Sequence, residues 1–156
     1  MPDLGGIVAR KLGRVAYAVY GQRALARAKT ELKALPWIGF DDDHAYMPGQ
    51  AWLHALLDGA KPAVRGNNGL VLHEAARAGA GLAVLPCYLG DPDPQLHRIG
   101  TVLPEVFADQ WLLVHRDLRA LPRVRAVMDA MIVLFQRERA LLEGAMVSSI
   151  NREKRT

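Results

Sequence analysis

Two asparagines and a glycine, Asn67-Asn68-Gly69, stand where the sequence changes from a short apolar run to a helical pattern. An asparagine side chain at a helix start can accept a hydrogen bond from an amide of the first turn, which has no partner within the helix. The start of a helix also carries roughly half a positive charge, so it attracts carboxylates and phosphates. The chemistry available here is reversible binding of an anion. The alternative is a turn that only caps its helix.

The elements around this turn run from strand to helix to strand. A short strand is predicted to end at Val64, and residues 69–78 have the spacing of a helix with an alanine-rich face. Glycines at 79 and 81 suit the left-handed residue that ends a helix. The run Leu82–Leu85 has no polar alternation, as expected of a strand covered on both faces, and Pro86 ends it.

These elements predict a parallel βαβ unit whose helix starts at the carboxyl end of the first strand. Ligands of open α/β sheets bind beyond the carboxyl ends of the strands. Asn67, Asn68, the amide of Gly69 and the residues after Pro86 are expected to converge there.

Several enzyme classes lack their residues in this sequence. The only serines, Ser148 and Ser149, do not belong to a G-x-S-x-G motif, which argues against a serine hydrolase. The glycines at 66 and 69 do not form the dinucleotide-binding pattern. His73-Glu74 begins like a zinc-protease helix, but Arg77 stands where the second zinc ligand would be. We predict no catalytic residue, no metal and no cofactor.

Cys87 and the acidic run at 41–44 are the remaining candidates for chemistry. Cys87 follows a predicted strand and could act as a nucleophile, but it has no identifiable histidine partner. A small buried residue is the favoured interpretation. Adjacent carboxylates in Asp41-Asp42-Asp43 diverge and lack the spacing of a calcium loop, so a solvated loop is favoured there.

Length and composition fit one soluble domain. The chain has 156 residues, 51% hydrophobic and 23% charged. It contains no apolar run near the roughly 20 residues of a membrane span, so we expect a cytoplasmic protein without a membrane partner. The net charge of +4 could attract polyanions. However, the arginines are scattered and no nucleic-acid-binding motif accompanies them, which favours a solvated basic surface.

The remaining elements follow from periodicity and turn residues. Alternation predicts a strand in the second half of residues 7–20. Further strands are expected at Trp37–Phe40 and Trp111–His115. Helices are expected at residues 22–28, at 47–57 with Pro48 in the first turn, and at 122–142 with Gly144 as the stop signal. Residues from Cys87 to Gly100 are expected to form a surface excursion.

Three segments together resemble the effector-binding domain of LysR-type transcriptional regulators. They are I-V-A-R-K-L-G at 7–13, V-R-G-N-N-G with the following residues at 64–86, and L-V-H-R-D-L-R-A-L-P-R-V-R-A-V-M-D-A-M at 113–131. The similarity covers roughly residues 7–140.

The resemblance implies an α/β fold like the type 2 periplasmic binding proteins, with two lobes and two crossing strands. Residues 1–20 would hold a crossing strand and a remnant of the first lobe, and residues 21–108 the second lobe. Residues 109–143 would hold the return strand and the long first-lobe helix, followed by a disordered tail at 144–156. The chain would thus contain one complete lobe and the C-terminal part of the other. We expect exposed apolar surface on the 122–142 helix and the 7–20 strand.

The same resemblance implies the function and the site. Asn67, Asn68 and Gly69 would contact a small anionic effector, with a carboxylate expected. Tyr20 and Gly21 would lie at the hinge, and Pro86 and Cys87 across the mouth of the cleft. The chain would sense this metabolite by lobe closure as part of a homo-oligomer, and DNA would be bound only through a helix-turn-helix domain absent from the chain. The alternatives are a free-standing small-molecule binding module of the same fold and, less favoured, an enzyme that uses Cys87.

Overall fold

The computed structural model describes residues 6–145, and it contains one six-stranded sheet with helices on both faces. Along the chain the strands are β1 (Ile7–Gln22), β2 (Trp37–Phe40), β3 (Val64–Gly66), β4 (Leu82–Pro86), β5 (Leu96–Ile99) and β6 (Phe107–His115). The helices are α1 (Arg23–Ala26), α2 (Gln50–Leu56), α3 (Gly69–Arg77), α4 (Cys87–Gly90), α5 (Pro122–Arg137) and α6 (Arg139–Leu142). Short 3-10 turns lie at Leu32–Ala34, Asp42–His44 and Arg116–Leu118. No described helix is long and apolar enough to cross a membrane.

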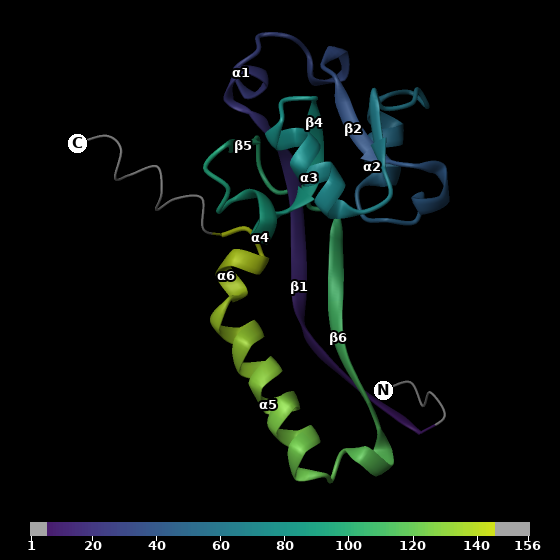
Figure 1. Ribbon diagram of the computed structural model, residues 1–156, viewed down its shortest axis with the longest axis vertical. Helices are drawn as coiled ribbons and strands as arrows, with labels where there is room; N and C mark the ends of the chain where they lie inside the picture. The colour runs from purple at the N-terminus through teal and green to yellow at the C-terminus, as the bar shows by residue number, and fades with distance from the viewer. Residues whose placement is uncertain (1–5, 146–156) are drawn as a thin grey trace, which may run out of the picture.

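The long strand β1 joins the two ends of the molecule (Figure 1). Its first part pairs antiparallel with β6, from Ile7 opposite His115 to Ala16 opposite Phe107. Its second part lies between β4 and β5 and pairs antiparallel with both. The sheet order is β3-β2-β4-β1-β5, with β6 beside the first part of β1. One end therefore carries the sheet with α1 to α4, and the other carries β1, β6 and α5.

The predicted βαβ unit, formed by β3, α3 and β4, is confirmed. Strand β2 lies between β3 and β4 in the sheet. Both β3 and β4 pair parallel with β2, so their carboxyl ends lie at one edge of the sheet. Strand β4 is buried from Leu82 to Leu85 because β2 and β1 flank it and helices cover both faces. This is the environment that the uninterrupted apolar run predicts.

The core has two parts, one on each face of the sheet. Leu72 and Ala76 of α3 pack with Tyr20, Ile38 and Leu85 on one face. On the other face Leu53 of α2 packs with Trp37, Leu82 and Val84. The small residue Ala76 is fully buried, which lets α3 lie close to the strands as its alanine-rich face predicts.

Three predictions from the sequence need correction. Helix α2 begins at Gln50 rather than at 47, because Gly49 adopts φ +90° and leaves Pro48 outside the helix. The helix predicted at 122–142 breaks at Glu138, whose ψ of 9° is not helical, and α6 continues after it. Strand β5 lies within the segment predicted as a surface excursion.

Exposed apolar side chains lie on α5 as predicted, but not on β1. Val127 and Val133 of α5 are 62% and 59% exposed. On the sheet side the exposed residues are Phe107, Trp111 and Leu113 of β6, at 42%, 52% and 57%. The prediction of exposed apolar side chains on residues 7–20 is therefore wrong. In the β1–β6 pair, the exposed large apolar side chains belong to β6. The predicted tail lies, from residue 146 on, outside the described residues.

Candidate functional site

Helix α3 starts at the edge of the sheet where β2 and β4 end. Asn68 is its N-cap, and the Asn68 Oδ1 atom accepts a hydrogen bond of 3.0 Å from the Val71 amide. The Asn68 Nδ2 atom donates to Asn67 Oδ1 at 3.0 Å. The capping role of this turn is thus confirmed, and it occupies the polar atoms of Asn68 with internal partners.

Two backbone amides of this first turn stay available. Among the described residues, neither the Gly69 nor the Leu70 amide donates to a protein acceptor. No acidic side chain lies in the first turn to neutralise the helix start. An anion placed there would receive hydrogen bonds and a favourable helix-dipole interaction.

A concavity of about 410 Å³ adjoins these amides. Gly69 and Leu70 line it from α3, Tyr17 from β1, and Pro86 and Tyr88 from the end of β4 and from α4. The walls are mainly apolar, with further contributions from Phe40, Met47, Pro48, Leu72, Val84, Leu85 and Leu89. Such a mainly apolar pocket with a few polar groups fits a small organic molecule.

Tyr17, one of the residues that line this concavity, carries a hydroxyl group. Burial, and then the neighbouring Tyr88 and Cys87, raise the pKa of Tyr17 above its usual value. The hydroxyl therefore stays neutral at physiological pH and can donate a hydrogen bond to an anion.

The structure places Tyr20, Gly21 and Cys87 in the interior rather than at an open hinge or mouth. Tyr20 and Cys87 are fully buried, and a Cβ atom on Gly21 would lie 2.5 Å from a methyl carbon of Leu82. The Tyr20 hydroxyl donates to Asp91 Oδ1 at 2.7 Å. Neighbouring groups cover these three residues in this conformation, and the ligand contacts that the resemblance implies for them stay a prediction.

Cys87 also lacks the environment of a nucleophile. Burial raises the pKa of its thiol more than the Tyr20 hydrogen bond and the Arg98 charge lower it. The thiol is therefore protonated at neutral pH, whereas the thiolate is the reactive species. Within residues 6–145, no group of three or more His, Cys, Asp or Glu side chains is placed to hold a metal ion.

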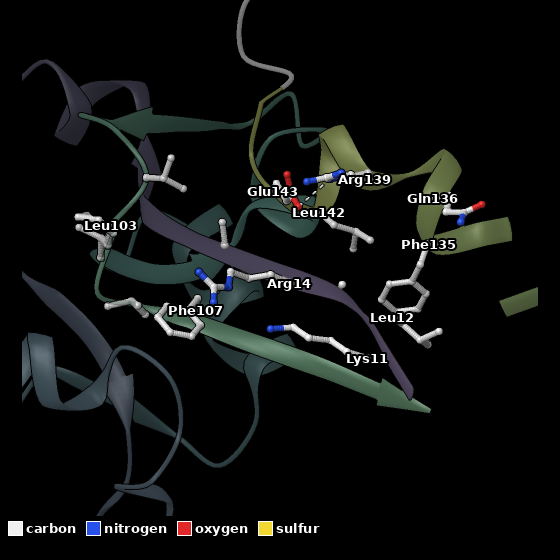
Figure 2. A pocket seen from close by; sticks show the side chains of 15 residues that line it. Lys11, Leu12, Arg14, Leu103, Phe107, Phe135, Gln136, Arg139, Leu142 and Glu143 are labelled. Carbon is white, nitrogen blue, oxygen red and sulfur yellow. Dashed lines mark hydrogen bonds and ion pairs between the residues drawn. The ribbon is translucent and has the colours of Figure 1, made fainter. Parts of the chain in front are cut away.

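A second concavity, of about 820 Å³, lies between β1, the loop before β6 and the α5–α6 helices (Figure 2). Its basic residues have internal partners: Lys11 and Arg14 pair with Asp109 at 2.6 and 3.1 Å, and Arg139 pairs with Glu143 at 3.0 Å. The Arg14 guanidinium also lies 3.8 Å from the centre of the Phe107 ring. These pairs reduce the positive charge that this concavity offers to a ligand.

Comparison with protein families matches residues 2–134 to the LysR substrate binding domain. The chain belongs to this family. The predicted resemblance is therefore confirmed, and so is the α/β fold of the periplasmic-binding-protein type. A comparison with curated proteins finds no match.

Solved structures of LysR-type regulators share this fold. The CrgA regulatory domain from Neisseria meningitidis is 17% identical, with a TM-score of 0.64 over 86% of this chain and 72% of that domain. The effector domain of AmpR from Pseudomonas aeruginosa is 17% identical, with a TM-score of 0.60 over 86% of this chain and 67% of the other. The AmpR effector binding domain from Citrobacter freundii is 15% identical, with a TM-score of 0.61 over 85% and 70%.

LysR substrate-binding domains are regulatory modules, which sense small-molecule effectors in regulators that bind DNA through a separate domain. Residues 6–145 form the substrate-binding fold and contain no DNA-binding domain. The family is regulatory rather than enzymatic, which agrees with the protonated, buried Cys87.

Substitutions of Asn68 test its capping role and leave the backbone amides of Gly69 and Leu70 in place. Asn68→Ala should lower the free energy of unfolding by about 1 kcal/mol, because the Val71 amide loses its acceptor. Asn68→Asp keeps an oxygen at this position and should leave stability within about 0.5 kcal/mol. Thermal unfolding followed by circular dichroism measures both changes. Equal stability of Asn68→Ala and the wild type would show that the cap contributes nothing.

Proposed function

We propose that the chain is the sensory module of a LysR-type regulator and binds a small carboxylate at the start of α3. The main support for this proposal is that the Gly69 and Leu70 amides of α3 have no acceptor among the described residues and lie beside a mainly apolar concavity. The carboxylate would accept hydrogen bonds from these amides and from the Tyr17 hydroxyl. Its apolar body would pack against Leu72, Pro86 and Tyr88.

The proposed site keeps part of the residues predicted from the sequence. Gly69 and Pro86 line the concavity, and Asn67 and Asn68 lie exposed in the turn directly before Gly69. In place of Tyr20, Gly21 and Cys87, which are buried, we propose Tyr17 and Tyr88.

Binding would favour closure of two lobes around the ligand, with residues 21–108 as the second lobe and β1 and β6 as the connecting strands. A ligand that contacts both lobes in the closed state and only one in the open state shifts the equilibrium toward closure. The regulator would act in the cytoplasm as a homo-oligomer. The exposed apolar side chains on β6 and α5 support association with a second copy.

Isothermal titration calorimetry with a panel of aliphatic and aromatic carboxylates tests the site. The Asn68→Asp variant should bind the best ligand at least about tenfold more weakly than the wild type, because a second negative charge then lies at the helix start. Asn68→Ser keeps a neutral cap and serves as the matched control, expected to bind within about threefold of the wild type. Heat from no carboxylate, or the same affinity in Asn68→Asp, would contradict the proposal.

A further inference from the structure

Helix α5 begins at the end of the molecule opposite α3 (Figure 1). A cluster of arginines lies beside this helix start. Arg10 of β1, Arg116 and Arg119 of the turn after β6, and Arg125 of α5 line one concavity of about 420 Å³. These side chains come from three segments of the chain and converge on the same space. Asp129 is the one acidic residue among those that line it.

Three of the four arginines of this cluster have no carboxylate partner among the described residues. Arg10, Arg119 and Arg125 are exposed and form no ion pair with any carboxylate of residues 6–145. Other arginines in that range are paired, such as Arg14 with Asp109 and Arg98 with Asp91. Like charges gathered in one concavity repel each other, and an anion would relieve this repulsion.

The sequence of α5 adds positive charge where a helix ordinarily prefers negative charge. Its first turn contains no acidic residue but holds Arg123 and Arg125, and its N-cap, Leu121, provides no side-chain acceptor. Basic side chains at a helix start act against the helix dipole and cost stability. The same placement becomes favourable when an anion lies between the arginines and the helix start.

The geometry points to a second binding site, for a small phosphate-bearing molecule, formed by Arg10, Arg116, Arg119 and Arg125. Guanidinium groups match the oxygens of phosphate through paired hydrogen bonds. The four arginines line one concavity together with the apolar residues Ala120, Met128 and Ile132. This shape suits a small molecule with one or two phosphate groups better than an extended nucleic acid backbone. The inference is independent of the carboxylate site at α3.

Titration of the full chain with inorganic pyrophosphate at low ionic strength tests this site. Binding should weaken at least about tenfold in the double variant Arg119→Gln/Arg125→Gln and should also weaken as salt is added. The matched control Arg23→Gln/Arg27→Gln removes the same charge from exposed residues around α1 and should bind within about twofold of the wild type. Circular dichroism checks that both variants are folded.

Three results would overturn the inference. The first is no binding of pyrophosphate by the folded wild type, and the second is an equal loss of binding in both double variants. The third is binding of a short DNA duplex that depends on Arg119 and Arg125 while pyrophosphate neither binds nor competes, which would identify a nucleic acid surface instead.

Discussion

Arg98→Met is expected to lower the free energy of unfolding by about 3–5 kcal/mol, because it leaves the buried Asp91 carboxylate without its charged partner. The Arg98 and Asp91 side chains are only 10% and 6% exposed. Arg98 Nε donates to Asp91 Oδ1 at 3.0 Å, and Arg98 Nη2 donates to Asp91 Oδ2. Arg98 Nη2 also donates to the Gly144 carbonyl at 3.0 Å, so the pair attaches the end of α6 to β5 and α4. Urea unfolding measures the change.

Two further variants test whether the loss of stability depends on the burial of the ion pair. Arg98→Met combined with Asp91→Leu should recover part of the loss, because two apolar residues can replace a buried ion pair at little cost. Recovery should be incomplete, because the buried Tyr20 hydroxyl loses its acceptor. Lys33→Met removes one partner of the exposed pair with Asp58, whose side chains are 55% and 70% exposed, and should change stability by less than about 1 kcal/mol. A loss below about 1 kcal/mol in Arg98→Met alone would contradict the assignment.

Trp37→Ala is expected to cost about 3–5 kcal/mol, through the cavity left on the α2 side of the sheet. Trp37 is 1% exposed and packs with Val19, Leu53 and Leu82. Its ring lies edge-on to Trp52 with centroids 5.8 Å apart. Because Trp37 lies in β2, which pairs with both β3 and β4, its loss should disturb the sheet edge that carries the α3 start. Urea unfolding followed by far-ultraviolet circular dichroism gives the value.

The indole N–H of Trp37 makes a separate contribution. It donates to the Leu32 carbonyl at 2.8 Å, so Trp37→Phe should cost about 1–3 kcal/mol by removing the donor while keeping a ring. Trp111→Ala is the control at an exposed site, since Trp111 is 52% exposed, and its effect should stay below about 1 kcal/mol. Similar losses for Trp37→Ala and Trp111→Ala would show that the core described for β2 is wrong.

Elements with local signals could be predicted from the sequence. Strand β4 has an uninterrupted apolar run, and α3 has a capping asparagine at its start and Gly79 at φ +81° just after its end. These signals depend on neighbouring residues alone. They predicted the βαβ unit and the position of the helix start at the sheet edge.

Features that depend on distant residues could not be predicted in this way. Strand β5 has the mixed sequence Leu96-His97-Arg98-Ile99, and it is a strand because β1 offers an edge for pairing. The first part of β1 is a strand for the same reason, since β6 pairs with it across about a hundred residues. Tyr20 is buried by residues distant in the sequence, such as Leu72 and Leu85, and its hydroxyl finds its acceptor in Asp91, 71 residues away, so no local pattern reveals its burial.

The most direct test of the effector site is an amide NMR titration of the ¹⁵N-labelled chain with the carboxylate that binds best in calorimetry. We expect the Gly69 and Leu70 amides to shift most, with smaller changes at Tyr17 and Tyr88, and we expect these shifts to require far more ligand in Asn68→Asp. Saturable shifts confined to Lys11, Arg14 and Arg139, with Gly69 and Leu70 unchanged, would place the ligand in the concavity beside α6 and contradict the account.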